Sequence, residues 1–103
     1  MKRTKSMVYK PTEESRELVL YAENTGDLYR RCTETAIKSL AKKYRKGTYN
    51  QDKAVDLWYA IATEASKMYS REFGYSFSVT DRYTAAVELE ESYRENVLEC
   101  AKN

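Results

Sequence analysis

Apolar residues recur along this chain at steps of three and four positions, the spacing that places side chains on one face of an α-helix. Three long stripes follow this period, over residues 27–46, 50–73 and 78–103. Their members are Tyr29, Cys32, Ala36, Ile37, Leu40, Ala41 and Tyr44 in the first, Ala54, Leu57, Trp58, Ile61, Ala65, Met68 and Tyr69 in the second, and Tyr83, Ala86, Val87, Leu89, Tyr93, Val97 and Cys100 in the third. The pattern predicts three long amphipathic helices.

Capping residues set the expected ends of these helices. Asp27 and Asn50 each begin a stripe and can accept a backbone hydrogen bond at a helix N-terminus. Gly47 and Gly74 each follow a stripe, where glycine tolerates the left-handed conformation that closes a helix. Ser78 begins the last stripe with an acidic residue three positions later, which resembles a capping box.

The chain before residue 27 divides into two parts. Residues 1–11 are basic and show no periodicity, so we expect a flexible arm. After Pro11, Thr12 can cap a short helix whose apolar face holds Leu18 and Tyr21. The expected fold class is therefore all-α, a compact bundle of three long helices plus one short N-terminal helix.

Two further expectations complete the organisation of the chain. Residues 75–79 alternate like a strand, but a single strand has no partner here, so we interpret them as a connector. Residues 12–103 then form one helical domain. Leu, Val, Ile and Phe total 17 of 103 residues, a thin aliphatic core, while the chain has 10 tyrosines and a tryptophan. Aromatic rings must supply much of the packing, and some of them are available for binding.

Composition argues against several kinds of chemistry. The chain has no histidine, so the usual acid–base group near neutral pH is missing. Cys32 and Cys100 lack the spacing of a zinc site, and we interpret them as free, buried or half-buried thiols. Neighbouring carboxylates such as Glu90 and Glu91 point around a helix and are expected on a solvated acidic face. We therefore predict no enzyme activity, no metal and no cofactor.

No stretch of the sequence approaches the run of about 20 apolar residues that crosses a bilayer. The basic N-terminal residues are not followed by the apolar segment of a signal peptide. These observations lead us to expect a cytoplasmic protein without a membrane partner.

Charge is distributed unevenly between the two halves of the chain. Residues 1–50 hold 12 cationic and 6 acidic side chains, whereas residues 51–103 hold 6 cationic and 10 acidic ones. The candidate basic binding face on the second helix consists of Arg31, Lys38, Lys42, Lys43, Arg45 and Lys46. Cations at a helix C-terminus favour its negative end, which explains part of this cluster. The same row could instead follow the phosphates of a nucleic acid or contact an acidic protein.

Tyrosines beside this basic face are candidates for an interface. Adjacent residues on a helix lie about 100° apart, so Tyr59 must sit at the edge of the stripe that holds Trp58. The candidate aromatic binding residues are Tyr49, Tyr59 and Tyr75, and Tyr9 is a further expected exposed ring. Exposed tyrosine next to arginine is a composition typical of protein interfaces.

A set of residues scattered between positions 17 and 73 forms a recognisable pattern. It comprises Glu17, Leu18, Leu20, Tyr21, residues 24–30, Lys43, residues 47–49, Ala54, Val55, Leu57, Tyr69, Glu72 and Phe73. This set resembles small uncharacterised accessory proteins of phages and mobile elements, for which no catalytic residue is assigned. The resemblance implies a protein that binds and disables a host factor, for example an anti-CRISPR-like inhibitor of a nucleic-acid-handling defence complex.

Together these observations predict a non-enzymatic binding protein of phage or mobile-element type. It would dock on a host protein or nucleoprotein complex through its basic face and exposed tyrosines, and its thin core makes a homodimer plausible. The alternative is a small nucleic-acid-binding protein that uses the basic patch.

Overall fold

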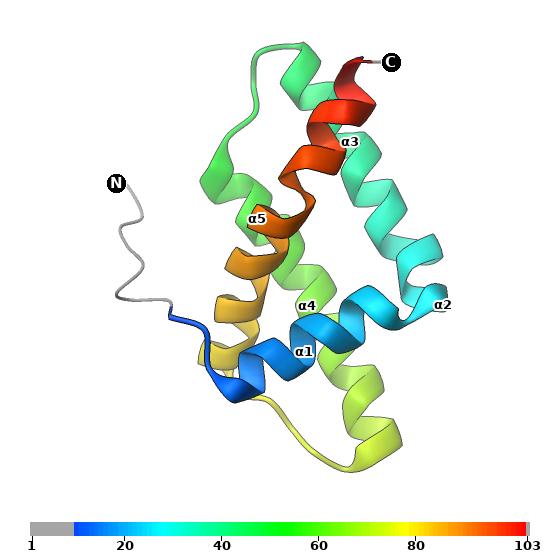
Figure 1. Ribbon diagram of the computed structural model, residues 1–103, viewed down its shortest axis with the longest axis vertical. Coiled ribbons are helices and arrows are strands. Elements are labelled where there is room, and N and C mark those ends of the chain that lie inside the picture. Colours follow the sequence, from blue (N-terminus) through cyan, green and yellow to red (C-terminus); the bar gives the residue numbers. More distant parts are fainter. Residues whose placement is uncertain (1–9, 103) are drawn as a thin grey trace.

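The computed structural model describes residues 10–102, and within them the chain forms helices and no strand (Figure 1). The elements are α1 (Glu13–Asn24), α2 (Gly26–Leu28), the π-helix η1 (Tyr29–Thr33), α3 (Glu34–Arg45), α4 (Gln51–Phe73) and α5 (Val79–Lys102). Because α2, η1 and α3 follow one another without a break, they form one long helical segment. The all-α fold of three long helices and a short N-terminal one is confirmed. The expected arm lies outside the described residues except for its last two.

Three of the four expected N-terminal caps are present, and Gly47 and Gly74 have the positive φ expected at the helix ends. At the start of α1, the Thr12 hydroxyl accepts the backbone N–H of Ser15 at 3.0 Å, and the Ser15 hydroxyl accepts that of Thr12 at 2.9 Å. Asn50 and Ser78 each accept the backbone N–H of the third residue on, at 3.0 Å. These bonds satisfy N–H groups that have no partner inside the helix, and they fix where the helices begin.

The expected cap at Asp27 is wrong. The second helical segment starts at Gly26, and Asp27 lies inside its first turn without capping it. Thr25 separates this segment from α1 instead. Its backbone is extended, and its hydroxyl donates to the Tyr21 carbonyl at 2.6 Å. The Asp27 carboxylate accepts a hydrogen bond from Arg31 one turn later.

The η1 segment changes which side of the second helix faces the core. Leu28 and Thr33 are both buried although they are five residues apart, a spacing that an α-helix would place on different faces. The π-helix η1 has a wider turn, with hydrogen bonds between residues five apart, so both side chains can face the core. After it the ordinary spacing resumes, and Ala36, Ile37 and Leu40 enter the core.

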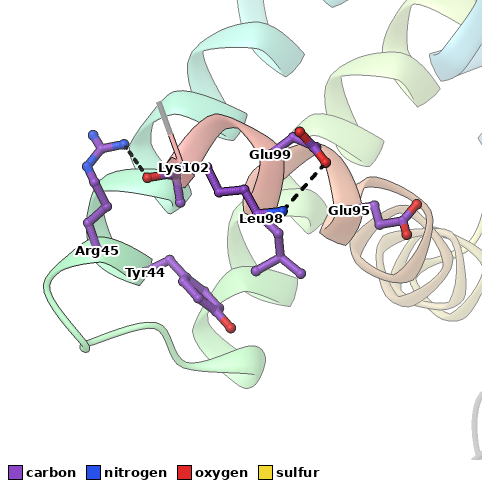
Figure 2. Close-up of a pocket in the computed structure, with 7 residues that line it drawn as sticks. Tyr44, Arg45, Glu95, Leu98, Glu99 and Lys102 are labelled. Carbon is purple, nitrogen blue, oxygen red and sulfur yellow. Dashed lines mark hydrogen bonds and ion pairs between the residues drawn. The ribbon is translucent and has the colours of Figure 1, made fainter.

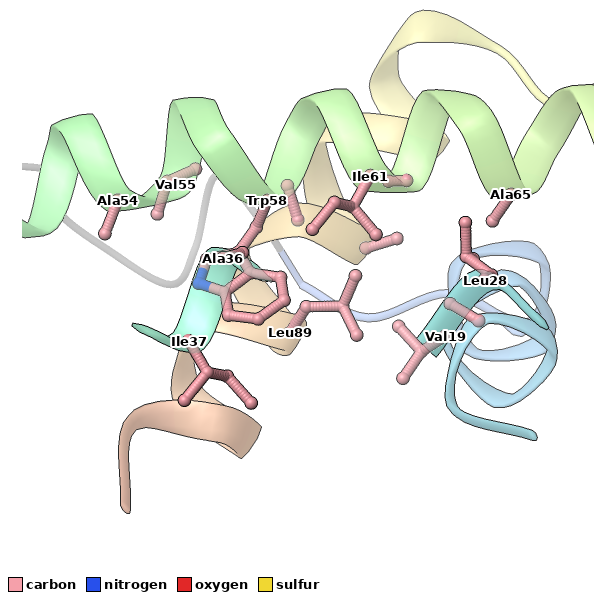
Figure 3. Close-up of a cluster of buried hydrophobic side chains, with 14 of the residues drawn as sticks. Val19, Leu28, Ala36, Ile37, Ala54, Val55, Trp58, Ile61, Ala65 and Leu89 are labelled. Carbon is pink, nitrogen blue, oxygen red and sulfur yellow. The ribbon is translucent and has the colours of Figure 1, made fainter. Parts of the chain in front are cut away.

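Helix α5 is the centre of the bundle. It packs on α1, α3 and α4, whereas the backbones of α3 and α4 come close to each other at few positions. Trp58 is fully buried and projects from α4 toward Ile37 of α3 and Leu89 of α5 (Figure 3). Its ring also stacks on Tyr93 at 5.2 Å.

The molecule is flat. Its principal extents are 41 × 32 × 16 Å. The shortest of them leaves room for only a narrow interior, which agrees with the thin aliphatic core of the sequence. Within the described residues, no helix is long and apolar enough to cross a membrane.

Candidate functional site

Four lysines of the predicted basic face form an open surface, which we call the lysine face. Its members are Lys38, Lys42, Lys43 and Lys46, all exposed along α3 and just after it. Among the described residues, none of these four ammonium groups forms an ion pair with a carboxylate. Their charge is therefore available to a ligand.

The two arginines of the predicted face are held by the protein itself. The Arg31 guanidinium pairs with Asp27 at 3.0 Å, and this raises the pKa of Arg31. The Arg45 guanidinium donates to the backbone carbonyls of Cys100 and Ala101, at 3.2 and 3.4 Å. Because these carbonyls lie at the C-terminal end of α5, Arg45 stabilises the negative end of that helix.

A groove of about 540 Å³ lies between the ends of α3 and α5 (Figure 2). Tyr44 and Leu98 provide apolar surface in it, and Glu95 and Glu99 line its α5 side. Lys102 approaches Glu99 at 3.9 Å. These carboxylates give the α5 side of the groove negative charge.

The sequence pattern placed Tyr44 in the core stripe, but in the structure Tyr44 does not continue that stripe. Its side chain is 46% exposed and lines the groove between α3 and α5. Its ring packs edge to face on Tyr49 at 5.5 Å. Tyr49 is half-buried in the turn before α4, so this predicted binding residue has most of its contacts inside the protein.

Glu90 is buried, and its expected place on a solvated face is wrong. Its exposed fraction is 1%, and its carboxylate accepts hydrogen bonds from Tyr49 at 2.7 Å and Gln51 at 3.4 Å. Arg94 binds both carboxylate oxygens, at 2.6 and 2.9 Å. Burial and the bond to Glu90 raise the pKa of the Tyr49 hydroxyl. This network joins the α3–α4 connection to α5.

Tyr59, predicted as an exposed ring, is half-buried. Its hydroxyl accepts a hydrogen bond from Arg82 at 3.2 Å, and the Arg82 guanidinium lies 5.8 Å from the ring centre. Tyr75 is exposed as predicted, with 44% of its surface free. Tyr9 lies outside the described residues.

Tyr75 belongs to a group of five rings that we call the aromatic pole. Its members are Tyr21 of α1, Tyr69 and Phe73 of α4, and Tyr75 and Phe77 of the connector, each within 6.4 Å of another ring of the group. Phe77 is buried, but Phe73 is 58% exposed. The pole lies at the opposite end of the long axis from the lysine face (Figure 1). The structure therefore places the predicted aromatic residue Tyr75 away from the predicted basic residues, whereas Tyr49 lies just after them in the chain and packs on Tyr44.

Carboxylates surround the aromatic pole. A shallow pocket of about 280 Å³ is lined by three of its rings and by Glu13, Glu14 and Glu17, which we call the acidic rim. The Tyr69 hydroxyl donates to Glu17 at 3.3 Å, and burial followed by this carboxylate raises the pKa of Tyr69. On the other side, Tyr21 donates to Glu72 at 3.0 Å. The rim residues lie in the first two turns of α1, whose positive end favours their charge.

Within residues 10–102, no three potential metal ligands come together. Glu90 is enclosed by its donors and lines none of the grooves described above. Cys32 and Cys100 are half-buried free thiols, as predicted.

Sequence reasoning missed Glu90 and the aromatic pole, although both left a signal. Glu90 lies four residues after Ala86 and seven before Val97, which are core positions of α5. The alternation of Phe73, Tyr75 and Phe77 was the signal for the pole. It places rings on one side of an extended connector, where they meet Tyr69.

Comparisons with protein-family models, with curated proteins and with solved structures give no match to this chain.

Proposed function

We propose that this chain is a non-enzymatic binding protein that docks on a host protein or nucleoprotein complex and inhibits it in the host cytoplasm. The inhibitory role and the phage or mobile-element setting rest on the resemblance of the segment 17–73. An anti-CRISPR-like protein directed at a nucleic-acid-handling defence complex is one form of this function.

The observation that carries the proposal is the exposure of the aromatic pole. Phe73 and Tyr75 remain about half exposed, next to a ring cluster that is otherwise packed. Large aromatic side chains grouped on the surface of a folded domain are typical of protein interaction sites. Covering them with a partner removes apolar surface from water, at about 25 cal/mol per Å².

A competition experiment tests this function. The immobilised chain is expected to retain a discrete partner from host lysate, and excess free chain should displace it. Replacing Phe73 and Tyr75 by serine should abolish this competition. Replacing Leu20, an exposed apolar residue outside the pole, should preserve it. The absence of any displaceable partner, or equal competition by all variants, would refute the proposal.

Nucleic-acid binding is a second candidate, favoured by the four exposed lysines of α3 that lack carboxylate partners among the described residues. Each phosphate neutralised on a duplex contributes about −0.9 to the slope of log affinity against log salt. Four lysines therefore give a slope of about −3.6 at most.

Fluorescence anisotropy with random duplex at several salt concentrations tests this candidate. Replacing Lys42 and Lys46 by glutamine should make the slope shallower by about 2. Binding that is absent even at low salt would eliminate it.

A further inference from the structure

We infer that the aromatic pole and its acidic rim receive an arginine side chain carried by a segment of the partner protein. This inference rests on the proposed function and adds the chemistry of the contact. It stands on two features that coincide in one place, an exposed group of rings and a set of carboxylates beside it.

The charge of the pocket defines the ligand. Glu13, Glu14 and Glu17 line it together with Tyr69, Tyr75 and Phe77. Among the described residues, no lysine or arginine forms an ion pair with these three carboxylates. A cation that enters the pocket thus meets carboxylates without an ion-paired lysine or arginine on one side and ring surface on the other.

Ring geometry narrows the choice of cation. Tyr75 and Phe77 meet at 78° with centres 4.8 Å apart, and Tyr69 meets Phe77 at 66° and 5.0 Å. Rings this close leave no space for a cation between them, so it must lie against the outside of the cluster. A planar guanidinium can stack there on a ring and also bind a carboxylate through two parallel hydrogen bonds, which a lysine ammonium cannot do.

Pocket size indicates a side chain rather than a free small molecule. A volume of about 280 Å³ lies at or below the smallest pockets that enclose small ligands. The exposed rings of Phe73 and Tyr75 extend the surface beyond the pocket and can contact the partner's backbone around the arginine.

An NMR titration of the ¹⁵N-labelled chain with a glycine-rich peptide that carries arginines tests the inference. The matched probe has citrulline at the same positions, because citrulline keeps the shape of arginine without its charge. Shift changes are expected over residues 13–17 and 69–77 with the arginine peptide. The citrulline peptide should bind at least about five-fold more weakly.

Variants of the chain locate the contact. Replacing the three glutamates of the rim by glutamine should weaken binding about ten-fold, and Tyr75→Ala about five-fold. The matched control replaces Glu91, Glu95 and Glu99, which are equally exposed and change the net charge by the same amount. This control should change affinity less than two-fold.

Several outcomes would overturn the inference. One is equal binding of both peptides, and another is an equal loss in the two triple variants. Binding that appears only after Lys2, Arg3 and Lys5 are replaced by glutamine would show that the chain's own basic segment occupies the pole. Concentration-dependent shifts at the pole without peptide would identify a second copy as the occupant. If the arginine peptide does not bind but a partner can still be displaced from lysate, the arginine contact is refuted and the proposed function is left intact.

Discussion

Burying the Glu90 carboxylate costs desolvation energy, which its donors must offset. Tyr49, Gln51 and Arg94 supply four hydrogen bonds to its two oxygens. Two of these donors lie at the α3–α4 connection, so one side chain of α5 fixes the position of that connection.

Arg94→Met is expected to destabilise the protein, because it leaves a buried carboxylate without its cation. We expect a loss of about 2 kcal/mol, less than for a fully buried pair since the guanidinium is partly exposed. Urea denaturation followed by circular dichroism measures it. The control is Arg31→Met, which removes an exposed pair of the same spacing and should leave the midpoint almost unchanged. Equal losses in the two variants would contradict the role of burial.

Alanine variants of Gly74 and Gly26 measure what a left-handed backbone conformation costs a residue with a Cβ atom. Gly74 has a φ of 71°, and a Cβ there would meet no atom within 4 Å, so any cost of alanine is conformational. Gly74→Ala should lower stability by about 1–2 kcal/mol. Gly26 lies at the start of a helix, where a Cβ would approach only the mobile end of Arg30 at 3.4 Å. Gly26→Ala should be neutral or slightly stabilising in thermal unfolding, and a loss equal to that of Gly74→Ala would refute this account.

Among the elements, α4 and α5 are joined in the core by the aromatic pair of Trp58 and Tyr93. Trp58 stacks on Tyr93 with an interplanar angle of 11°. Trp58→Ala should cost about 3–5 kcal/mol, a large fraction of the stability of a domain this size. Chemical denaturation with Leu20→Ala as the exposed control measures the difference. A cost below 1 kcal/mol would show that the pair is not central to the core.

The positions of these elements could be predicted from sequence because they depend on local chemistry. Asn50 and Gly74 delimit α4 through a hydrogen bond and a positive φ, which any chain with those residues can form. The π turn and the burial of Glu90 depend on contacts between parts of the chain that are far apart in sequence, such as α5 and the α3–α4 connection. The aromatic pole likewise required the return of the connector onto α4. Periodicity within one helix carries no such information.

For the whole molecule, we expect a loss of stability in alkali because tyrosine hydroxyls are buried on folding. Burial, followed by the nearby charge of Glu23, raises the pKa of Tyr93 to about 12, whereas an unfolded tyrosine ionises near pH 10. The unfolded state therefore loses its proton first, and the stability from the neutral hydroxyl is lost as pH rises from about 10 to about 12.

Urea midpoints at pH 9 and pH 11 measure this loss. The midpoint should fall at the higher pH, and Tyr93→Phe should reduce the fall. An unchanged midpoint together with uniform titration of all tyrosines near pH 10 would contradict the burial of these hydroxyls.

The molecule carries two different surfaces at the ends of its long axis, the lysine face and the aromatic pole (Figure 1). They are too far apart to form a single compact site, so each must contact a separate part of a partner or a separate partner. We assign the main protein contact to the aromatic pole.

Site-specific photocrosslinking tests this assignment most directly. Benzoylphenylalanine is placed at Tyr75 in one variant and at Lys42 in another, and each is irradiated in host lysate. We expect a discrete adduct from position 75 that excess unlabelled chain suppresses, with a weaker adduct or none from position 42. A specific adduct from position 42 alone would contradict it.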